Sequence, residues 1–336
     1  MRLSLLGKNK KILLVGEGNF SFAVTLLKYN LNIDLTASCF ENNINEISKK
    51  NTDILKRCGV QVFLGVDATK LEEHKILSKE NFDIVIFNFP HVGGKMRIEK
   101  NRELLRKFFM SIRAVLKSDG EIFLTLCDGQ GGTPADKDIR YWHDSWQVTE
   151  MAAHGRFILV AVEPFDSSLF ESYTVTGYRS LEKRFNTQGS LTHIFKLSEK
   201  PTIDNIAPKE KIDLKMYDNV VNWQNIISDI SNISNISNDY NLSLYPKSYT
   251  FDITLPITSG FNIIKFYETL YNFAGLVISN VELLRYYKFY KLKETITFRI
   301  TYESKKFPLY RKLTIDLHEN VIPKIINKYL NIFVPS

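Results

Sequence analysis

The sequence has few cysteines and no long apolar run, and each shortage excludes a class of protein. Its 336 residues include only three cysteines, Cys39, Cys58 and Cys127, which lie in or beside apolar segments without metal-ligand spacing. We therefore expect neither a disulfide scaffold nor a metal site, but reduced thiols in an intracellular protein. No apolar stretch reaches the roughly 20 residues of a transmembrane helix, and the N-terminal apolar run is too short for a signal peptide. We expect no membrane association.

The positive charge is concentrated towards the end of the chain. The whole sequence carries 44 Lys+Arg against 37 Asp+Glu, a net charge of +7. Residues 241–336 hold 13 basic and 7 acidic residues, so this last third alone carries +6. A basic segment of this kind favours a polyanionic partner. A solvated, lysine-rich surface is the alternative interpretation.

Strand-like and helix-like segments alternate over the first part of the chain, which predicts a doubly wound parallel sheet. The helices are expected at 20–29, 42–58 and 99–116. The strands are expected at 11–16, 34–40, 60–65, 82–89 and 120–127. Two further apolar runs, 157–165 and 191–197, are expected to form a terminal hairpin. The fold class predicted for residues 1–198 is therefore Rossmann-like α/β.

The chain changes character at residue 199. Residues 199–243 are polar and contain three Ile-Ser-Asn repeats, which predicts a low-complexity linker with one short docked helix near Trp223. Residues 244–336 then follow the order βαββαβ, with strands at 249–256, 276–287, 294–304 and 332–334. The helices are expected at 261–273 and 316–330. This order predicts an α+β ferredoxin-like domain with a four-stranded antiparallel sheet.

Polar residues and glycines follow the strands of the first domain, where an open parallel sheet binds its ligands. Gly16 and Gly18 follow the first strand, although Ser21 replaces the third glycine of G-x-G-x-x-G. Glu41 follows the second strand, and Asp67 with Ala68 the third. Each has a structural alternative: an ordinary tight turn for the glycines, helix capping for the two carboxylates. Their joint placement predicts a nucleotide-like cofactor.

The fourth strand ends in Asn88-Phe-Pro-His91, which indicates the kind of cofactor. It is similar to the Asn/Asp-Pro-Pro-aromatic tetrapeptide of methyltransferases that act on planar nitrogens. In those enzymes the amide oxygen accepts a hydrogen bond from the target N–H. His91 could also be a half-buried structural histidine. A dehydrogenase has no use for this tetrapeptide, so an NAD-dependent oxidoreductase is disfavoured.

Three segments together, 12–23, 87–95 and Asn101-Arg102, resemble the Rossmann-like methyltransferases that act on uridine N3 of large-subunit ribosomal RNA. The resemblance implies S-adenosylmethionine as cofactor and an RNA uridine as substrate. It assigns catalysis to Asn88, Pro90 and His91, with His91 or Asp128 as proton acceptor. It assigns cofactor binding to Gly16, Glu17, Gly18, Asn19, Phe20, Glu41, Asp67, Ala68 and Asn88.

The tail resembles the ferredoxin-fold anticodon-binding domain at the end of the phenylalanyl-tRNA synthetase β-subunit, through residues 249–254 and 297–304. This resemblance implies rRNA or tRNA as partner and a nucleolar, nuclear or cytoplasmic location. A non-catalytic RNA-binding scaffold is the alternative. The basic residues expected to contact RNA are Lys95, Arg97, Lys288, Lys291, Lys293, Arg299, Lys305, Lys306, Arg311 and Lys312.

Overall fold

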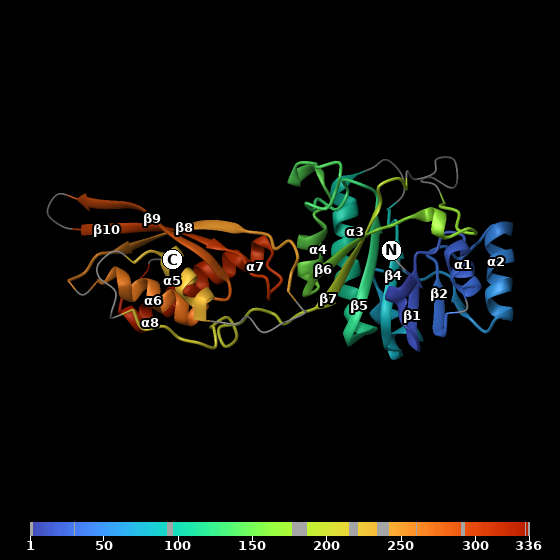
Figure 1. The fold of residues 1–336 in the computed structure, drawn as a ribbon, viewed down its shortest axis with the longest axis horizontal. Helices are drawn as coiled ribbons and strands as arrows, with labels where there is room; N and C mark the ends of the chain where they lie inside the picture. Colours follow the sequence, from blue (N-terminus) through green and yellow to red (C-terminus); the bar gives the residue numbers. More distant parts are fainter. Residues whose placement is uncertain are drawn as a thin grey trace. The chain divides into compact units, whose positions relative to one another are not determined.

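The chain folds into two compact units, Met1–Ser198 and Glu199–Ser336. The computed structural model describes residues 3–29, 31–92, 97–176, 187–214, 221–233, 242–259, 261–289, 293–332 and 334. Figure 1 shows that the first unit is built around one large sheet flanked by helices, and the second around a smaller sheet. Each unit is considered by itself.

The first unit contains a seven-stranded sheet in the order β3-β2-β1-β4-β5-β7-β6. Strands β1 to β5 pair in parallel, whereas β7 runs antiparallel to both of its neighbours. The predicted parallel sheet and the terminal hairpin of β6 and β7 are both confirmed. The strands are β1 (Lys10–Val15), β2 (Ile33–Ser38), β3 (Gln61–Phe63), β4 (Phe82–Asn88), β5 (Leu116–Leu126), β6 (Phe157–Pro164) and β7 (Leu191–Leu197).

Helices cover both faces of this sheet. Alternate residues of a strand point to opposite faces, and in β4 both sets are apolar and pack against helices. Ile84 and Ile86 of β4 belong to the same buried cluster as Phe22 of α1 (Ser21–Lys28). The next residue along, Phe87, instead contacts Phe108 of α3 (Ile98–Ser111), with ring centroids 5.1 Å apart. Helix α2 (Glu46–Arg57) packs beside α1, and α4 (Val148–His154) packs beside α3.

Helices α2 and α3 have different bounds from those that the sequence predicted. Helix α2 begins at Glu46 and not near residue 42, because the side chain of Asn45 accepts a hydrogen bond from the Ser48 amide, 2.9 Å away, and caps the helix there. Helix α3 ends at Ser111 and is followed by one 3₁₀ turn, so that β5 already begins at Leu116. The apolar spacing that suggested a longer helix belongs to this turn and to the start of the strand.

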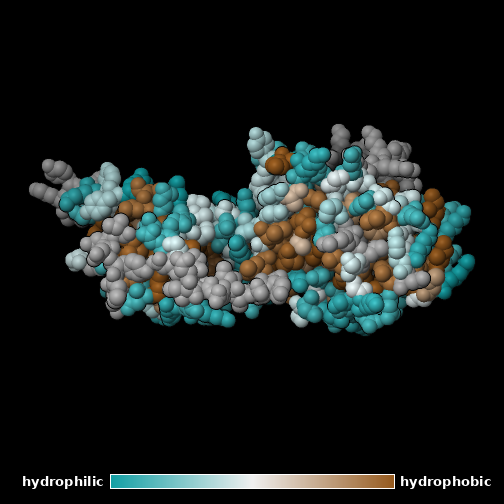
Figure 2. All heavy atoms as spheres, viewed as in Figure 1, coloured by the Kyte–Doolittle hydropathy of each residue, from teal (hydrophilic) through white to brown (hydrophobic). Residues whose placement is uncertain are grey.

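The edge strand β6 leaves some apolar surface uncovered. In Figure 2, hydrophobic side chains gather over the part of the first unit where Figure 1 places α4 and β6. Val160, Ala161 and Val162 of β6 are half-buried, whereas Phe157, Ile158 and Leu159 are buried. A strand at the end of the sheet has neighbours on only one side, which accounts for this partial exposure.

The second unit contains three antiparallel strands in the order β8-β10-β9. They are β8 (Tyr249–Pro256), β9 (Ile278–Phe289) and β10 (Lys293–Tyr302), and α6 (Ile263–Ala274) joins β8 to β9. After β10 come α7 (Arg311–Asp316), a π-helical turn (Leu317–Val321) and α8 (Ile322–Leu330). The predicted fourth strand at 332–334 is wrong for the described residues, Ile332 and Val334. Asn331 turns the chain with φ 56°, and Ile332 is buried without forming a strand.

One face of this small sheet forms the core under the helices, because side chains alternate between the two faces of a strand. Phe298 is fully buried and stacks on Phe266 of α6, with ring centroids 4.3 Å apart. Ile253 and Ile300 lie in the same cluster. The opposite face carries the polar residues of the alternation, and its central pair is Asp252 opposite Arg299.

The interpretation of residues 199–243 as a linker needs a correction. Ile206, Leu214, Trp223 and Ile226 are all at most 1% exposed and belong to the core of the second unit. Helix α5 (Trp223–Ile233) supplies two of them. The short docked helix expected near Trp223 is therefore confirmed, whereas Ile206 and Leu214 are isolated apolar residues in a polar background, so composition alone suggested a linker there.

Candidate functional site at the ends of strands β1 and β4

The turn after β1 requires glycine at its first position. Gly16 has φ +67°, a conformation that favours glycine, and a Cβ atom there would lie 2.4 Å from Cε2 of Phe87. Phe87 pairs with Val15 across the β1–β4 ladder. The backbone at Gly16 can approach β4 this closely only because Gly16 has no side chain. This approach brings the turn beside Asn88.

Glu17 is a buried carboxyl group in this turn. Its Oε2 accepts a hydrogen bond from the Ala23 amide at 3.2 Å, and its own amide donates to the Ser38 carbonyl at 2.9 Å. Burial raises the pKa of Glu17 to about 7, and the Ala23 hydrogen bond offsets part of that rise. No ion pair of the described residues involves Glu17. A cationic ligand group would supply the missing counter-charge.

A segment from beyond β6, residues 173–176, lies over the same turn. The side-chain nitrogen of Asn19 donates to the carbonyl and hydroxyl oxygens of Thr174, at 3.2 and 2.7 Å. The Ser21 hydroxyl donates to the Thr174 carbonyl at 3.1 Å and accepts from the Thr174 amide at 2.9 Å. Tyr173 is anchored against Phe22, with ring centroids 5.4 Å apart. We call residues 173–176 the covering segment.

The covering segment leaves only a small cavity above the turn. The cavity has a volume of about 50 Å³, far below the roughly 300–1,000 Å³ of ordinary ligand sites. A nucleotide-sized ligand enters only if the covering segment moves. The lining consists of Gly16, Glu17, Gly18, Asn19, Asn88, Phe89 and the four residues of the covering segment.

Asn88 joins a polar row across three strands. Its Oδ1 accepts a hydrogen bond from the hydroxyl of Thr125 at 2.7 Å, and that hydroxyl lies 3.0 Å from the hydroxyl of Thr192. The three residues are register partners on β4, β5 and β7, and both threonines are fully buried. Nδ2 of Asn88 is buried and has no partner among the described residues. A buried amide donor without a partner is rare and is a candidate ligand contact.

The residues after Asn88 adopt a constrained conformation. Phe89 has φ 52°, which is uncommon for a residue with a side chain, and its amide donates to the Thr125 carbonyl at 2.9 Å. Pro90 is buried, and the half-buried ring of His91 lies 6.1 Å from that of Trp146. Burial lowers the pKa of His91, so the imidazole is neutral at pH 7 and can accept a proton.

The other predicted cofactor residues lie outside the cavity. Glu41 is exposed, and Asp67 accepts two hydrogen bonds from Thr69, at 2.9 and 2.7 Å, in a local turn. Ala68 is buried behind it. Glu41 follows β2, which is next to β1, and Asp67 follows β3, which is next to β2, so both residues lie at the same edge of the sheet as the turn after β1. The fully buried side chain of Phe20 is part of the core.

Helix α3 holds two loops of this edge in place, a role that the sequence did not reveal. Asn101 is fully buried, accepts from the Val92 amide and donates to the Arg97 carbonyl, both at 3.2 Å. Arg102 donates to the carbonyls of His143 and Ser145 at 2.6 and 2.7 Å. Asn101 therefore fixes the chain after β4, and Arg102 fixes the loop after β5. Asp128, a candidate proton acceptor, is engaged in that loop by the amides of Lys137 and Asp138.

The sequence reasoning also missed Thr125, Thr192 and the covering segment. Thr125 is the one polar residue near the end of the apolar stretch Phe123–Leu126, and this interruption was the available signal. Nothing local marks residues 173–176, because their contacts to Asn19 and Ser21 span more than 150 positions. Within the described residues no cluster of three metal-ligating side chains occurs, and no helix has the length and apolarity to cross a bilayer.

The basic residues predicted for RNA binding differ in their surroundings. Arg299 donates two hydrogen bonds to Asp252, at 2.8 and 3.0 Å, and Lys288 lies 2.8 Å from Glu294. Both side chains are exposed, and so are the remaining described positions, Arg97, Lys305, Lys306, Arg311 and Lys312. Lys95, Lys291 and the side chain of Lys293 lie outside the described residues.

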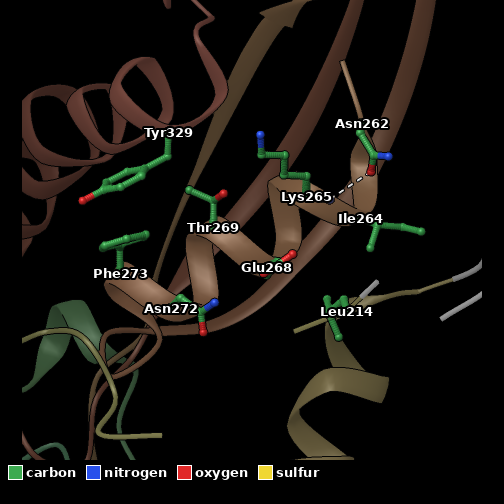
Figure 3. A pocket seen from close by; sticks show the side chains of 9 residues that line it. All are labelled: Leu214, Asn262, Ile264, Lys265, Glu268, Thr269, Asn272, Phe273 and Tyr329. Atoms are coloured by element: carbon green, nitrogen blue, oxygen red, sulfur yellow. Dashed lines mark hydrogen bonds between the residues drawn. The ribbon is translucent and has the colours of Figure 1, made fainter. Parts of the chain in front are cut away.

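The second unit has a larger hollow, which Figure 3 shows beside α6. Its volume is about 650 Å³, and Phe273 stacks on Tyr329 at its edge, with ring centroids 3.9 Å apart. Asn262 caps the start of α6 there by accepting from the Lys265 amide at 3.0 Å. None of the predicted site residues lines this hollow. We therefore keep the strand-end cavity as the candidate site, because it unites the turn with Asn88.

The strand order, with β7 alone antiparallel, and the ligand-type turn after β1 define a Rossmann-like methyltransferase fold. Residues 13–177 match the model of a protein family described as BMT5-like, rRNA (uridine-N3-)-methyltransferase. This part of the chain is therefore a BMT5-like domain, as the three sequence segments suggested.

The chain is similar to ferredoxin-fold anticodon-binding domain-containing protein 1 of Homo sapiens, with 46% identity over 191 residues, and to its Mus musculus homolog, with 47%. These alignments cover 55% of the chain and 31% of each relative, so the chain matches about a third of their length. It is 24% identical to the 25S rRNA (uridine(2634)-N(3))-methyltransferase of Saccharomyces cerevisiae, over 49% of this chain and 65% of that one.

Solved methyltransferase structures are also similar, at lower identity. A 30S ribosomal A1408 methyltransferase from an uncultured bacterium matches with TM-score 0.38 and 16% identity, over 58% of this chain and 90% of that chain. A TehB-like SAM-dependent methyltransferase from Corynebacterium glutamicum matches with TM-score 0.34 and 12% identity, over 58% and 84%.

Proposed function

We propose that the chain is an S-adenosylmethionine-dependent RNA methyltransferase that acts on N3 of a uridine in rRNA or tRNA. The observation that carries the proposal is the meeting of the turn after β1 with Asn88 at one cavity. The match of residues 13–177 to the uridine-N3 methyltransferase family supports the choice of reaction. The name of the yeast relative supports an rRNA target.

The chemistry of the cavity fits the amino-acid end of the cofactor. Glu17 offers a buried carboxyl group to an ammonium, and the partnerless Nδ2 of Asn88 offers a donor to an oxygen. The cofactor can enter only after the covering segment has moved, because the cavity of about 50 Å³ is too small for it. The bound cofactor would supply an activated methyl group. Glu41 and Asp67, at the ends of the adjacent strands, would hold its ribose and adenine.

The protein residues would contribute mainly alignment, because a sulfonium methyl group needs little acid–base help. Uridine N3 must lose its proton when it is methylated. The neutral imidazole of His91 is the group at this edge that is suited to accept it. Phe89, held at φ 52° by the Thr125 carbonyl, and the buried Pro90 fix the position of that imidazole.

The second unit would hold structured RNA. Its strand order β8-β10-β9 is that of the first three strands of a ferredoxin-like sheet, and its segment carries the excess of positive charge. The names of the mammalian relatives are consistent with an anticodon-binding type of domain. The exposed basic residues Lys305, Lys306, Arg311 and Lys312 would contact phosphates.

A non-catalytic RNA-binding scaffold is the second candidate, and the small size of the cavity favours it. Calorimetry with S-adenosylmethionine and S-adenosylhomocysteine separates the two. Binding that Gly18→Asp abolishes supports the enzyme, whereas no binding of either compound supports the scaffold. Mass spectrometry of nucleosides from total RNA, with and without the protein, then tests the reaction. Loss of methyluridine from one RNA class would identify both the product and the target.

A further inference from the structure

The polar row across β4, β5 and β7 determines which atom of Asn88 is left without a hydrogen-bond partner. The Thr125 hydroxyl donates to Oδ1 of Asn88 at 2.7 Å. A hydroxyl has a single proton, so the contact at 3.0 Å between the two threonines must run from Thr192 to Thr125. The chain of donors therefore ends on the amide oxygen, and the amide NH₂ points the other way.

The amide nitrogen is the atom that lacks a partner. Nδ2 of Asn88 is buried from solvent and donates to none of the described residues, and Asn88 lines the cavity together with Glu17 and Gly18. A buried donor without a partner is costly to the fold, so a ligand that supplies an acceptor regains that free energy. Both threonines are fully buried on neighbouring strands in register, so the orientation is built into the sheet.

We infer that Asn88 acts as a hydrogen-bond donor to an oxygen atom of the ligand, and that Thr125 and Thr192 are positioning residues that fix this orientation. The inference rests on the proposed function and changes the role expected of Asn88. The tetrapeptide resemblance implies an amide oxygen that accepts from the target N–H. Here that oxygen is already bonded to Thr125. The acceptor is either a carbonyl oxygen of uracil or a carboxylate oxygen of the cofactor.

The decisive variant is Asn88→Asp, because a carboxylate can accept but cannot donate. If the amide oxygen serves the ligand, aspartate replaces it with little loss. If the amide nitrogen serves the ligand, the carboxylate faces another oxygen, and we expect a loss of roughly a hundredfold. Thr125→Val keeps the shape of the side chain and removes the hydroxyl, and we expect a loss of roughly tenfold. Thr192→Val should cost a few-fold, because Thr192 acts through Thr125.

The matched control is Thr36→Val, since Thr36 is a buried threonine of the same sheet, on β2, away from the row. The full chain and its variants are compared by methyl transfer to RNA, by S-adenosylhomocysteine calorimetry and by thermal unfolding. A higher Kd for S-adenosylhomocysteine in Asn88→Asp identifies the cofactor carboxylate as the acceptor. A lower kcat/KM for RNA with unchanged Kd identifies the uracil carbonyl.

The outcomes separate this inference from the proposed function. If the wild-type chain binds and methylates while Asn88→Asp stays folded and active, the donor role is wrong and the function stands. If Asn88→Asp unfolds, the threonine variants decide: wild-type activity in Thr125→Val would also overturn the inference. If the wild-type chain neither binds S-adenosylhomocysteine nor methylates RNA, the proposed function fails, and the inference fails with it.

Discussion

A Cβ atom on Gly18 would lie 2.0 Å from the hydroxyl oxygen of Thr176, so the turn after β1 and the covering segment are packed against each other without room for a methyl group. Thr176 is far from Gly18 in the sequence, because it follows β6. This contact closes the cavity beside Asn88. The contact between Gly18 and Thr176 therefore determines both the packing of the turn and the access of a ligand to the cavity.

Gly18→Ala is expected to displace the covering segment and to lower the free energy of unfolding by roughly 1–3 kcal/mol, because the added methyl group overpacks a filled space. Thr176→Gly removes all three atoms that the methyl group would meet. The double variant should therefore recover part of the loss, as measured by urea unfolding. Thr176→Gly alone is the control, since it shows what the loss of the threonine side chain costs when Gly18 is unchanged. Equal stability of Gly18→Ala and the double variant would contradict this account.

Ser21→Ala is expected to loosen the covering segment. It removes the acceptor of the Thr174 amide and one of the two donors to the Thr174 carbonyl, at a cost of about 0.5–1.5 kcal/mol to the closed state. Hydrogen exchange of residues 173–176 should become faster, and S-adenosylhomocysteine should associate faster, because opening precedes binding. Ser48→Ala, a buried serine on α2, serves as the control. Unchanged exchange at 173–176 would show that the segment is held elsewhere.

The sequence predicted the first domain well because its strands are apolar runs and its glycines follow them directly. Gly16 illustrates this: a residue that must be glycine for conformational and steric reasons stands at the predicted strand end. Long-range contacts were not predictable in the same way. The bond between Asn19 and Thr174 joins residues 155 positions apart, and no local pattern encodes it. In the tail, Ile206 and Leu214 belong to the core although their polar neighbours suggested a linker.

Glu17→Gln is expected to stabilise the empty protein at alkaline pH. The folded state raises the pKa of Glu17 from 4.5 to about 7, so the wild-type chain loses stability as the pH rises from about 4.5 to 7. Above pH 7 the loss is complete and amounts to roughly 3 kcal/mol. Glutamine keeps the hydrogen bond from the Ala23 amide and has no charge to bury.

Urea unfolding of wild type and Glu17→Gln at pH 5 and pH 8 measures this effect. The stability difference should grow towards pH 8, whereas Glu73→Gln, which changes an exposed glutamate, should show no such trend. Parallel pH profiles of wild type and Glu17→Gln would contradict the prediction. Binding of a cationic ligand should also release protons near pH 7, because it lowers the pKa of Glu17. Calorimetry in buffers of different ionisation enthalpy detects that release.

Arg102→Ala is expected to free the loop after β5 from α3. Two backbone carbonyls, those of His143 and Ser145, lose their donor, so limited proteolysis within residues 137–146 should accelerate several-fold. Arg106→Ala, on the same helix, is the control, because it removes only contacts within α3, to Glu103 and Met110. Such a local pair contributes about 0.3–0.5 kcal/mol, so its loss should leave the loop unchanged. Equal proteolysis of the two variants would show that Arg102 does not hold the loop.

In the tail, we expect the loss of the Arg299 charge to affect RNA binding less than the loss of the charges of Lys305 and Lys306, because Arg299 forms an ion pair with Asp252. Arg299 donates two hydrogen bonds to the carboxylate of Asp252, which largely neutralises its charge and so weakens its attraction to a phosphate. We expect Arg299→Gln to change RNA affinity less than twofold. Removing Lys305 and Lys306 together should weaken binding and lower the slope of log K against log salt by about 0.7 per lost phosphate contact.

Asp252→Asn is the informative partner variant. It releases Arg299, which should tighten RNA binding and steepen the salt dependence, as fluorescence anisotropy between about 50 and 200 mM salt can measure. All four side chains are exposed, so the fold should persist and thermal unfolding checks this. A larger loss for Arg299→Gln than for the lysine pair would place the RNA on the polar sheet face and not beside Lys305. Because the pair leaves Arg299 little free charge, we expect the lysines to dominate.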